Sequence, residues 1–591
     1  MLSTAAGRSQ LRWVMNLALL SLCLIAFLSL LSFKTPGKDT QGGGVASSDP
    51  LKRYAGFAVF GPYWPMERAF TSEAERIAYL EEQGYLIAQH TSRLSGNLVR
   101  VPISVWEVLG QIATVAPNGP AIPVYQLGDK AASAALEKVW IALRESLTAL
   151  EAGRDAAGNP LRWHAWDAFF SGIQKYNREL TTHPARQLQP VFVDLLLTEL
   201  TPALLIEAPV TVMDRASRQG LWDAYRQLHL KFIRKLIQRY GHGYATADIR
   251  AQIPVAVAIE MFNEPDYNWL PDEAKIEKAL NPDAYPCDKY ITQLHLSQIP
   301  EHDLPAKGCV KRSFSYEEQD FGQPAVHTAL RDFRWGRKFD KYGSTFADLH
   351  EHISFAAKDE IHRGGAQMVV VSSAVTHVNL DWFVRMFRAN PNTFRYVDKI
   401  AIHPYHWPRH DIHDMRFVGP PLEKDWMLVS PREFARDYFK RFDFIRQLAA
   451  LVAEPDQEKS YGLAGKSLWI TEFGLPTKKL GKANAALRDH PRLFIYDRAT
   501  PIPEGIRAMV WEELWNAFLD QVSADFLRQN HVETLLLFTL RETAMEHTND
   551  DSHSNLALYR ADWSPRLAPE VLSRLTELFR RFRDSGASEK R

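Results

Sequence analysis

Residues 255–265 have the sequence VAVAIEMFNEP, and this stretch indicates the fold class of the chain. The apolar run Val255–Phe262 predicts a strand that is buried on both faces, as in a parallel sheet. The run ends in the polar pair Asn263 and Glu264, followed by Pro265, which cannot donate to a strand ladder. Polar groups at the carboxyl end of a buried parallel strand are typical of the catalytic face of an α/β fold.

A second apolar run that ends in a glutamate lies near residue 470. With this run, seven further strands are predicted along the chain. The sequence SLWITEFG at 467–474 places Glu472 directly after the strand Ser467–Thr471. The other predicted strands are Gly56–Gly61, Asn97–Ile103, Pro190–Leu196, Gln367–Ser372, Lys399–His403 and Glu533–Leu540. Eight strands that alternate with helical segments predict a (β/α)₈ barrel. A six-stranded doubly wound sheet is the alternative, but no glycine-rich fingerprint follows the first strand.

Helix signals lie between these strands. Ser72 and Glu75 form the pattern of a capping box, and we expect that helix to close at Gly84. Helical spacing also predicts a helix that stops before Gly241 and a last helix that closes the ring; their apolar positions are Leu221, Tyr225, Leu228 and Phe232, and Val571, Leu575, Leu578 and Phe582. Two long segments, Ser104–Gln189 and Asp266–Gln323, are expected to shape the cleft.

The N-terminal part of the chain differs from the rest. Residues 13–33 form an apolar run long enough to span a bilayer as a helix, which predicts a transmembrane signal anchor behind a short cytoplasmic tail at 1–12. Residues 34–53 are expected to be a flexible linker, and 54–591 the barrel domain. The barrel would then lie outside the cytoplasm, on the periplasmic or extracellular side. A cleaved signal peptide remains an alternative and implies the same compartment.

The amino-acid composition bears on nucleic-acid binding and on disulfide formation. The 591 residues contain 70 Lys plus Arg and 70 Asp plus Glu, a balance that argues against a nucleic-acid partner. Of three cysteines, Cys23 lies in the apolar run. Cys287 and Cys309 share one polar segment and are a candidate disulfide outside the cytoplasm, with two free thiols as the alternative. The sequence does not indicate an oligomeric state.

Two glutamates at strand ends across one barrel mouth fit the cleavage of a glycosidic bond. One carboxylic acid protonates the leaving oxygen, and the other carboxylate attacks the anomeric carbon or activates water. We assign Glu264 as the acid/base and expect its pKa to be raised by an apolar setting and by Glu472. Glu472 is the predicted nucleophile, and Arg100 is the candidate cation beside it. Arg100 has an equally weighted alternative role as structural partner of a buried carboxylate, and Glu260 is expected to form an ion pair.

These motifs resemble clan A of the glycoside hydrolases, and the chain looks most similar to its family-five, cellulase-like group. The resemblance implies that Glu264 and Glu472 act by double displacement with retention, on β-linked glycans. It implies that Asn263 binds the sugar 2-hydroxyl and that Arg100 lies beside the nucleophile. His403 and Tyr405 match a His-x-Tyr motif of that group. No cofactor or metal is implied.

The chain departs from the family pattern at two strand ends. Asp194–Leu196 stands where family five often has a His, and Phe538–Leu540 where a Trp usually lies beneath the sugar. These departures leave open a non-catalytic glycan-binding barrel.

Aromatic residues and histidines complete the candidate set. Tryptophans and a tyrosine after strand ends are candidates to stack on sugar rings, although each one singly is more often loop packing; they are Trp64, Trp106, Tyr267, Trp269 and Trp407. A histidine cluster leaves metal-assisted hydrolysis as a third reading, disfavoured because its spacing matches no zinc motif; it comprises His403, His406, His410 and His413. A tethered enzyme suggests a substrate in the cell's own envelope or exopolysaccharide.

Overall fold

The computed structural model describes most of the barrel and part of its connections. The described residues are 53–59, 70–109, 129–154, 158, 160–182, 188–198, 215–245, 252–265, 344–376, 378, 380–404, 427–429, 442–474, 494–496, 515–541 and 557–588. The predicted span at 13–33 and residues 34–52 of the predicted linker lie outside these ranges, as do both cysteines of the candidate disulfide. None of the described helices is long and apolar enough to cross a membrane.

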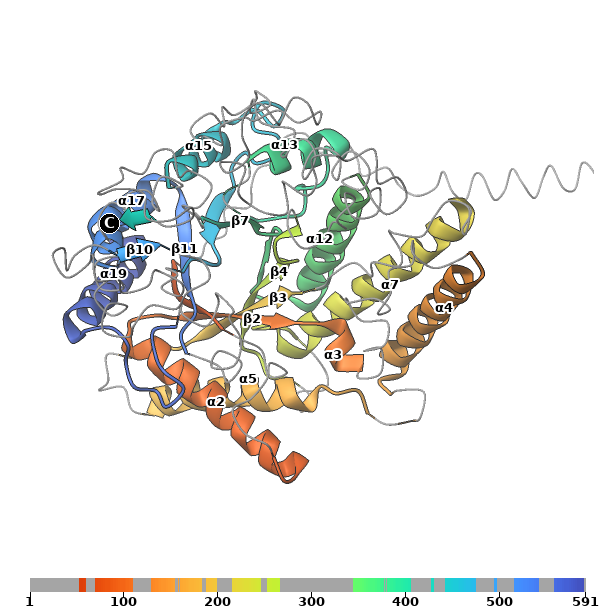
Figure 1. Cartoon of the computed structure of the whole chain (residues 1–591), viewed down its shortest axis with the longest axis horizontal. Helices are drawn as coiled ribbons and strands as arrows, with labels where there is room; N and C mark the ends of the chain where they lie inside the picture. Colours follow the sequence, from red (N-terminus) through yellow and green to blue (C-terminus); the bar gives the residue numbers. More distant parts are fainter. Residues whose placement is uncertain are drawn as a thin grey trace, which may run out of the picture. The chain divides into compact units, whose positions relative to one another are not determined.

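Eight parallel strands form a closed ring (Figure 1). Each of the eight predicted segments contains or overlaps one of them: β1 Tyr54–Ala58, β2 Leu98–Ile103, β3 Phe192–Leu197, β4 Ala256–Met261, β5 Val369–Val371, β7 Lys399–His403, β9 Ser467–Ile470 and β11 Val532–Phe538. Neighbours pair in that order, β5 pairs with β7, and β11 returns to pair with β1. The predicted (β/α)₈ barrel is therefore confirmed, and the doubly wound alternative is wrong because an open sheet would leave two edges.

Three short strands were not predicted. β6, Val375–Thr376, extends the chain beyond β5 and pairs in parallel with β7, where Thr376 is the partner of His403. β8, Met427–Val429, and β10, Phe494–Tyr496, form a separate antiparallel pair. Segments of two or three residues carry too little hydrophobic periodicity to be recognised from sequence.

Helices surround the ring of strands (Figure 1). In chain order they are α2 Glu73–Arg93, α3 Val105–Leu109, α4 Asp129–Ala152, α5 His164–Thr182, α7 Arg215–Tyr240, α12 Ser344–Gly364, α13 Leu380–Ala389, α15 Phe442–Ala453, α17 Ala524–Gln529 and α19 Pro569–Ser588. The predicted helix before Gly241 is α7, and the predicted last helix is α19. Apolar residues that defined the period of each helix are buried, among them Tyr225, Phe232 and Leu575.

Helix α2 begins as predicted but ends later. The Ser72 hydroxyl accepts from the Glu75 N–H at 3.1 Å, while the Glu75 carboxylate accepts from the Thr71 N–H at 2.8 Å rather than from Ser72. The expected stop at Gly84 is wrong, because α2 continues through Arg93. Gly84 instead lets α5 approach closely: a Cβ there would lie 1.9 Å from the Phe169 carbonyl oxygen.

The period of two along each strand separates an apolar layer from a polar layer inside the barrel. The apolar layer is a buried cluster of Leu98, Val257, Ala258, Val371, Ala374, Ala401, Trp469 and Leu536. Two residues further along their strands, toward the carboxyl ends, follow Arg100, Glu260, His403 and Thr471, all of them buried. The strand alternation that builds the core thus also delivers the polar side chains to one end of the barrel.

Candidate active site

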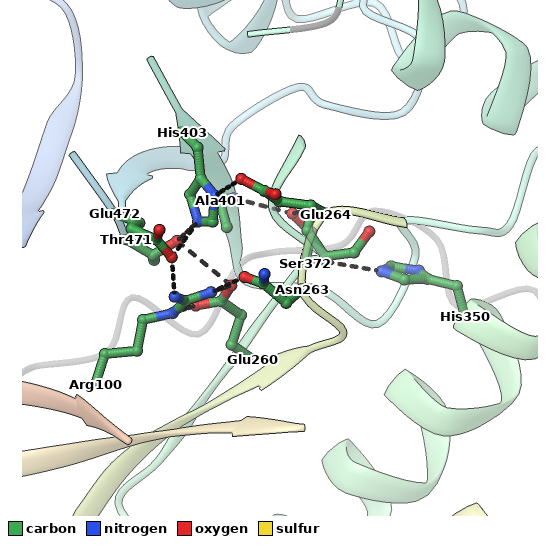
Figure 2. Close-up of polar contacts among 11 residues, drawn as sticks. Arg100, Glu260, Asn263, Glu264, His350, Ser372, Ala401, His403, Thr471 and Glu472 are labelled. Atoms are coloured by element: carbon green, nitrogen blue, oxygen red, sulfur yellow. Dashed lines mark hydrogen bonds and ion pairs between the residues drawn. The ribbon is translucent and has the colours of Figure 1, made fainter. Parts of the chain in front are cut away.

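Glu264 and Glu472 meet at the carboxyl ends of β4 and β9 (Figure 2). One carboxylate oxygen from each, together with a ring nitrogen of His403, lie within 4.8 Å of one another. Both glutamates are shielded from water, with 16% and 12% of their side chains exposed. Residues far apart in the sequence are therefore brought together where the strand-end pattern predicted.

The turn after β4 holds Glu264 in an unusual backbone conformation. Phe262 and Glu264 have φ angles of 60° and 47°, in the left-handed region. Residues other than glycine adopt this backbone conformation at a cost of about 1–3 kcal/mol each. Packing maintains the turn: the Phe262 ring is buried with its centroid 5.8 Å from that of Phe346. Asn263, between the two, bridges to Ala374 beyond β5. Backbone strain held by surrounding packing is common at functional sites.

Arg100 connects the acidic residues inside the barrel. Its Nε and Nη2 donate to the two oxygens of Glu260 at 2.8 and 2.7 Å. Its Nη1 donates to Glu472 Oε2 at 2.8 Å, and Nη2 also donates to Asn263 Oδ1 at 2.8 Å. The two roles considered for Arg100 therefore coexist, because one guanidinium pairs with the buried Glu260 and with Glu472.

The charge of Arg100 is secured by its partners. Burial lowers the pKa of Arg100, but Glu260, Glu472 and Asp194 more than offset this effect, so that the pKa lies above its ordinary value. Glu260 is fully buried, and the ion pair expected for it is present.

Asp194 also belongs to the buried polar layer. In the sequence this residue stands out only as part of a departure from the family pattern. It lies on β3 in register with Arg100 and is fully buried. Neither of its oxygens has hydrogen-bond geometry with a partner among the described residues, although Glu260 is close enough to act on it. Burial first, and then the charge of Glu260, hold the pKa of Asp194 well above its ordinary value, against the smaller effect of Arg100. Asp194 therefore holds a proton more strongly than a carboxyl group in water does.

His403 lies between the two glutamates. Its Nδ1 is 2.7 Å from Glu264 Oε1, and its Nε2 is 3.2 Å from Thr471 Oγ1 and 3.9 Å from Glu472 Oε2. Burial lowers the pKa of His403 from 6.5 to about 4; Glu472 opposes this effect, and Arg100 adds to it. The ring is therefore neutral at neutral pH.

A second buried histidine supports the site from outside the barrel (Figure 2). His350, on α12, lies with Nδ1 2.9 Å from the Thr393 carbonyl oxygen, and its Nε2 accepts from the Ser373 N–H at 3.2 Å. The neighbouring Ser372 hydroxyl accepts from the Ala401 N–H at 2.9 Å and so ties the end of β5 to β7. This role of His350 has no signal in the sequence, because an isolated histidine on an amphipathic helix is usually a packing residue.

Several predicted site residues lie outside the described ranges. They are Trp64, Tyr267, Trp269, Tyr405 and Trp407, and also His406, His410 and His413 of the histidine cluster. Trp106 is described and was a candidate to stack on sugar, but it is 8% exposed and packs in the core from α3. Its sugar-stacking role is therefore not supported, because α3 turns the ring inward.

The one group of side chains among the described residues that is close enough to ligate a metal ion is Glu264, His403 and Glu472. Both ring nitrogens of His403 already lie within hydrogen-bond distance of a partner, at Glu264 and Thr471. A metal at this point would have to displace one of these contacts.

Replacing Asp194 and Glu260 by their amides should separate a carboxyl group that favours its protonated form from one that pairs with Arg100. Because burial and Glu260 favour the protonated form of Asp194, we expect Asp194→Asn to change the free energy of unfolding at neutral pH by less than about 1 kcal/mol. Glu260→Gln leaves Arg100 with a weakened partner and should lower the free energy of unfolding by roughly 3–5 kcal/mol. Urea unfolding of both variants measures this, and equal losses in the two would show that Asp194 is ionised.

The buried histidines predict a loss of stability in mild acid. Burial lowers the pKa of His350 from 6.5 to about 4, against a smaller effect of its bond to Thr393. Between these values the unfolded chain binds a proton that the folded chain does not, so stability is complete above pH 6.5 and declines as the pH falls toward 4. The loss from His350 alone should reach about 3 kcal/mol near pH 4.

The measurement is urea unfolding across this pH range for the wild type and for His350→Gln. The amide can donate to Thr393 and accept from Ser373 but does not titrate. We expect the variant to be less stable near neutral pH and to show a shallower decline in acid. Parallel curves for the two proteins would assign the decline to other groups.

Comparison with known proteins found matches of low similarity among solved structures. No family model and no curated protein matches the sequence. Among solved structures, a hyperthermophilic β-glucosidase from Pyrococcus furiosus is 12% identical and aligns over 92% of this chain and 99% of its own, with a TM-score of 0.37. An exo-β-1,4-mannosidase, Op5Man5, from Opitutaceae bacterium strain TAV5 is 11% identical over 90% of this chain and 60% of its own, with a TM-score of 0.36. A family 39 glycoside hydrolase from Bacteroides cellulosilyticus WH2 is 10% identical over 89% and 64%, with a TM-score of 0.35. At this level of similarity, the activities named for those proteins are not transferred to this chain.

Proposed function

We propose that this chain is a retaining glycoside hydrolase, with Glu264 as acid/base and Glu472 as nucleophile. The proximity of the two carboxylates, with one oxygen of each within 4.8 Å, is the observation that carries the proposal. Retaining enzymes hold the two groups about 5–5.5 Å apart, whereas inverting enzymes leave about 6.5–9.5 Å for a water molecule. The close approach of Glu264 and Glu472 favours direct attack by one of them on the sugar.

The two glutamates have different surroundings, which supports different roles. Glu472 accepts a charge-assisted hydrogen bond from Arg100, and this contact favours the carboxylate that a nucleophile requires. Glu264 contacts the neutral ring of His403. Environments that favour opposite protonation states in two neighbouring carboxyl groups are the usual basis for dividing acid and nucleophile.

The reaction follows from this division. In the first step Glu472 forms a bond to the anomeric carbon while the proton of Glu264 passes to the leaving oxygen. In the second step water attacks the anomeric carbon, gives a proton to Glu264 and releases Glu472. Asn263 presents its Oδ1 to Arg100, so its amide N–H groups point away from Arg100 and are oriented to donate to a sugar hydroxyl.

Glutamine variants test the two roles. For Glu472→Gln we expect loss of nearly all turnover, because the amide cannot form the glycosyl intermediate. For Glu264→Gln we expect kcat on a natural glycan to fall by about 10²–10⁴, with much of it restored on an aryl glycoside whose leaving group needs no proton. The measurement is reducing-end release by the full chain across a panel of β-linked glycans, with the anomeric configuration of the first product followed by NMR.

Other outcomes identify the alternatives. An inverted product would contradict the double displacement. Glycan binding without turnover, unchanged by Glu472→Gln, would indicate a non-catalytic binding barrel. Activity that a chelator removes would indicate metal-assisted chemistry at the histidine cluster.

The substrate and location belong to the same proposal. The family-five resemblance supports β-linked glycans, and the apolar run at 13–33 supports an anchor that holds the barrel outside the cytoplasm, close to an envelope or exported polysaccharide. We expect the full chain to sediment with membranes and to shorten the cell's own surface glycan. A released form lacking residues 1–48 that does so equally well would contradict the need for a tether.

A further inference from the structure

The hydrogen bonds around His403 have a direction that places a proton on Glu264. His403 Nε2 lies 3.2 Å from Thr471 Oγ1, and the Thr471 hydroxyl donates toward Glu260 Oε1 at 3.4 Å. On the other side of the ring, Nδ1 lies 2.7 Å from Glu264 Oε1. Glu260, Thr471, His403 and Glu264 thus form a chain of hydrogen bonds across the barrel mouth, visible in Figure 2.

Thr471 determines which ring nitrogen carries the hydrogen. A hydroxyl has one hydrogen to donate, and Glu260, as the carboxylate paired with Arg100, can only accept. If the Thr471 hydrogen turned toward His403, its oxygen would face the Glu260 carboxylate without a hydrogen between them. The favoured arrangement donates from Thr471 to Glu260 and from His403 Nε2–H to Thr471 Oγ1.

The surrounding charges favour the same arrangement. The charged groups that act on His403 are Arg100 from β2, Glu260 from β4 and Glu472 after β9. Glu472 Oε2 lies 3.9 Å from Nε2, so both ionised carboxylates of this set attract a hydrogen to the Nε2 side of the ring. The pKa of His403, lowered by burial to about 4, leaves a single hydrogen on the ring at neutral pH.

We propose that Thr471 and Glu260 act through His403 as positioning residues that keep Glu264 protonated. With its hydrogen on Nε2, the ring presents a lone pair at Nδ1 toward Glu264, and two acceptors at 2.7 Å would repel each other. A hydrogen must therefore lie on Glu264. The inference deepens the proposed function, because it explains how the acid is ready before substrate binds.

The same arrangement assists the second chemical step. When Glu264 has given its proton to the leaving oxygen, its carboxylate faces the Nδ1 lone pair, which raises its affinity for a proton. That affinity favours the second step, in which Glu264 takes a proton from the attacking water while the bond between the sugar and Glu472 breaks.

Removing the Thr471 hydroxyl should shift the pH dependence of the reaction. In Thr471→Val the Nε2–H loses its acceptor, so the other tautomer becomes populated and donates from Nδ1 to an ionised Glu264. The alkaline limb of kcat/KM, which reports loss of the Glu264 proton, should move about one pH unit lower, equivalent to roughly tenfold weaker proton binding. We expect the acid limb to stay in place and Thr471→Ser to restore the wild-type profile.

A matched control separates this effect from a general change in the barrel. Thr534→Val removes a buried hydroxyl on β11 that makes no hydrogen bond with the described residues, so its pH profile should match the wild type. If Thr471→Val lowered kcat/KM by the same factor at every pH, its role would be structural and the inference wrong.

A spectroscopic measurement tests the tautomer without any substrate. The full chain is labelled with ¹⁵N-histidine, and His403 is assigned by comparison with His403→Asn. We expect an unprotonated Nδ1 and a protonated Nε2 in the wild type, and mixed tautomers in Thr471→Val. A protonated Nδ1 in the wild type would overturn the inference even for an active hydrolase, whereas the expected tautomer in a chain that cleaves no glycan would overturn only the proposed function.

Discussion

Arg100 carries a positive charge into the interior of the barrel, and the arrangement of the site depends on how that charge is paired. Removing an ion from water costs several kcal/mol unless partners surround it closely. Glu260 supplies two of these contacts and Glu472 a third. Because the three residues come from β2, β4 and the end of β9, the pairing requires a closed ring of strands. The polar layer and the barrel closure therefore stabilise each other.

The distribution of protons completes the charge balance of this layer. Ionising every carboxyl group around Arg100 would leave several negative charges in a buried volume, which is highly unfavourable. Asp194 lacks a hydrogen bond from Arg100, and burial together with Glu260 raises its pKa, while burial keeps His403 neutral. Glu260 and Glu472, which have such bonds, remain the partners of the guanidinium. The position of each carboxyl group relative to Arg100 thus decides how strongly it favours its protonated form.

The barrel and the positions of Glu264 and Glu472 at strand ends could be predicted from sequence because both depend on local pattern. Buried parallel strands are continuous apolar runs, and a polar residue at the end of such a run, as at Glu264 and Glu472, marks the functional end of the barrel. The features that were missed depend on tertiary neighbours. Gly84 has the sequence pattern of a helix stop, whereas its close contact with α5 has no sequence signal. Trp106 follows a strand end as a sugar-stacking residue would, but α3 turns its ring into the core.

The protonation states and contacts of residues inside the barrel are harder still to predict from sequence. Asp194 has the same chemical identity whether it is ionised or neutral, and its register beside Arg100 and near Glu260 decides the question. His350 is one of several histidines on helices, and only its contacts with Thr393 and Ser373 give it a role. Strand alternation identifies which residues point inward, but the protonation state of each depends on partners from other strands.

The bidentate contact between Arg100 and Glu260 has a further consequence for the proposed reaction. In the first step the negative charge leaves Glu472, which becomes an ester, and appears on Glu264. The total charge of the site is unchanged, but Arg100 loses the charge of one partner. Glu260 still holds Nε and Nη2 of the guanidinium at 2.8 and 2.7 Å, so Arg100 is never a buried ion without an anion beside it. A structural ion pair that takes no part in bond breaking thereby lets the nucleophile change its charge without destabilising the barrel interior.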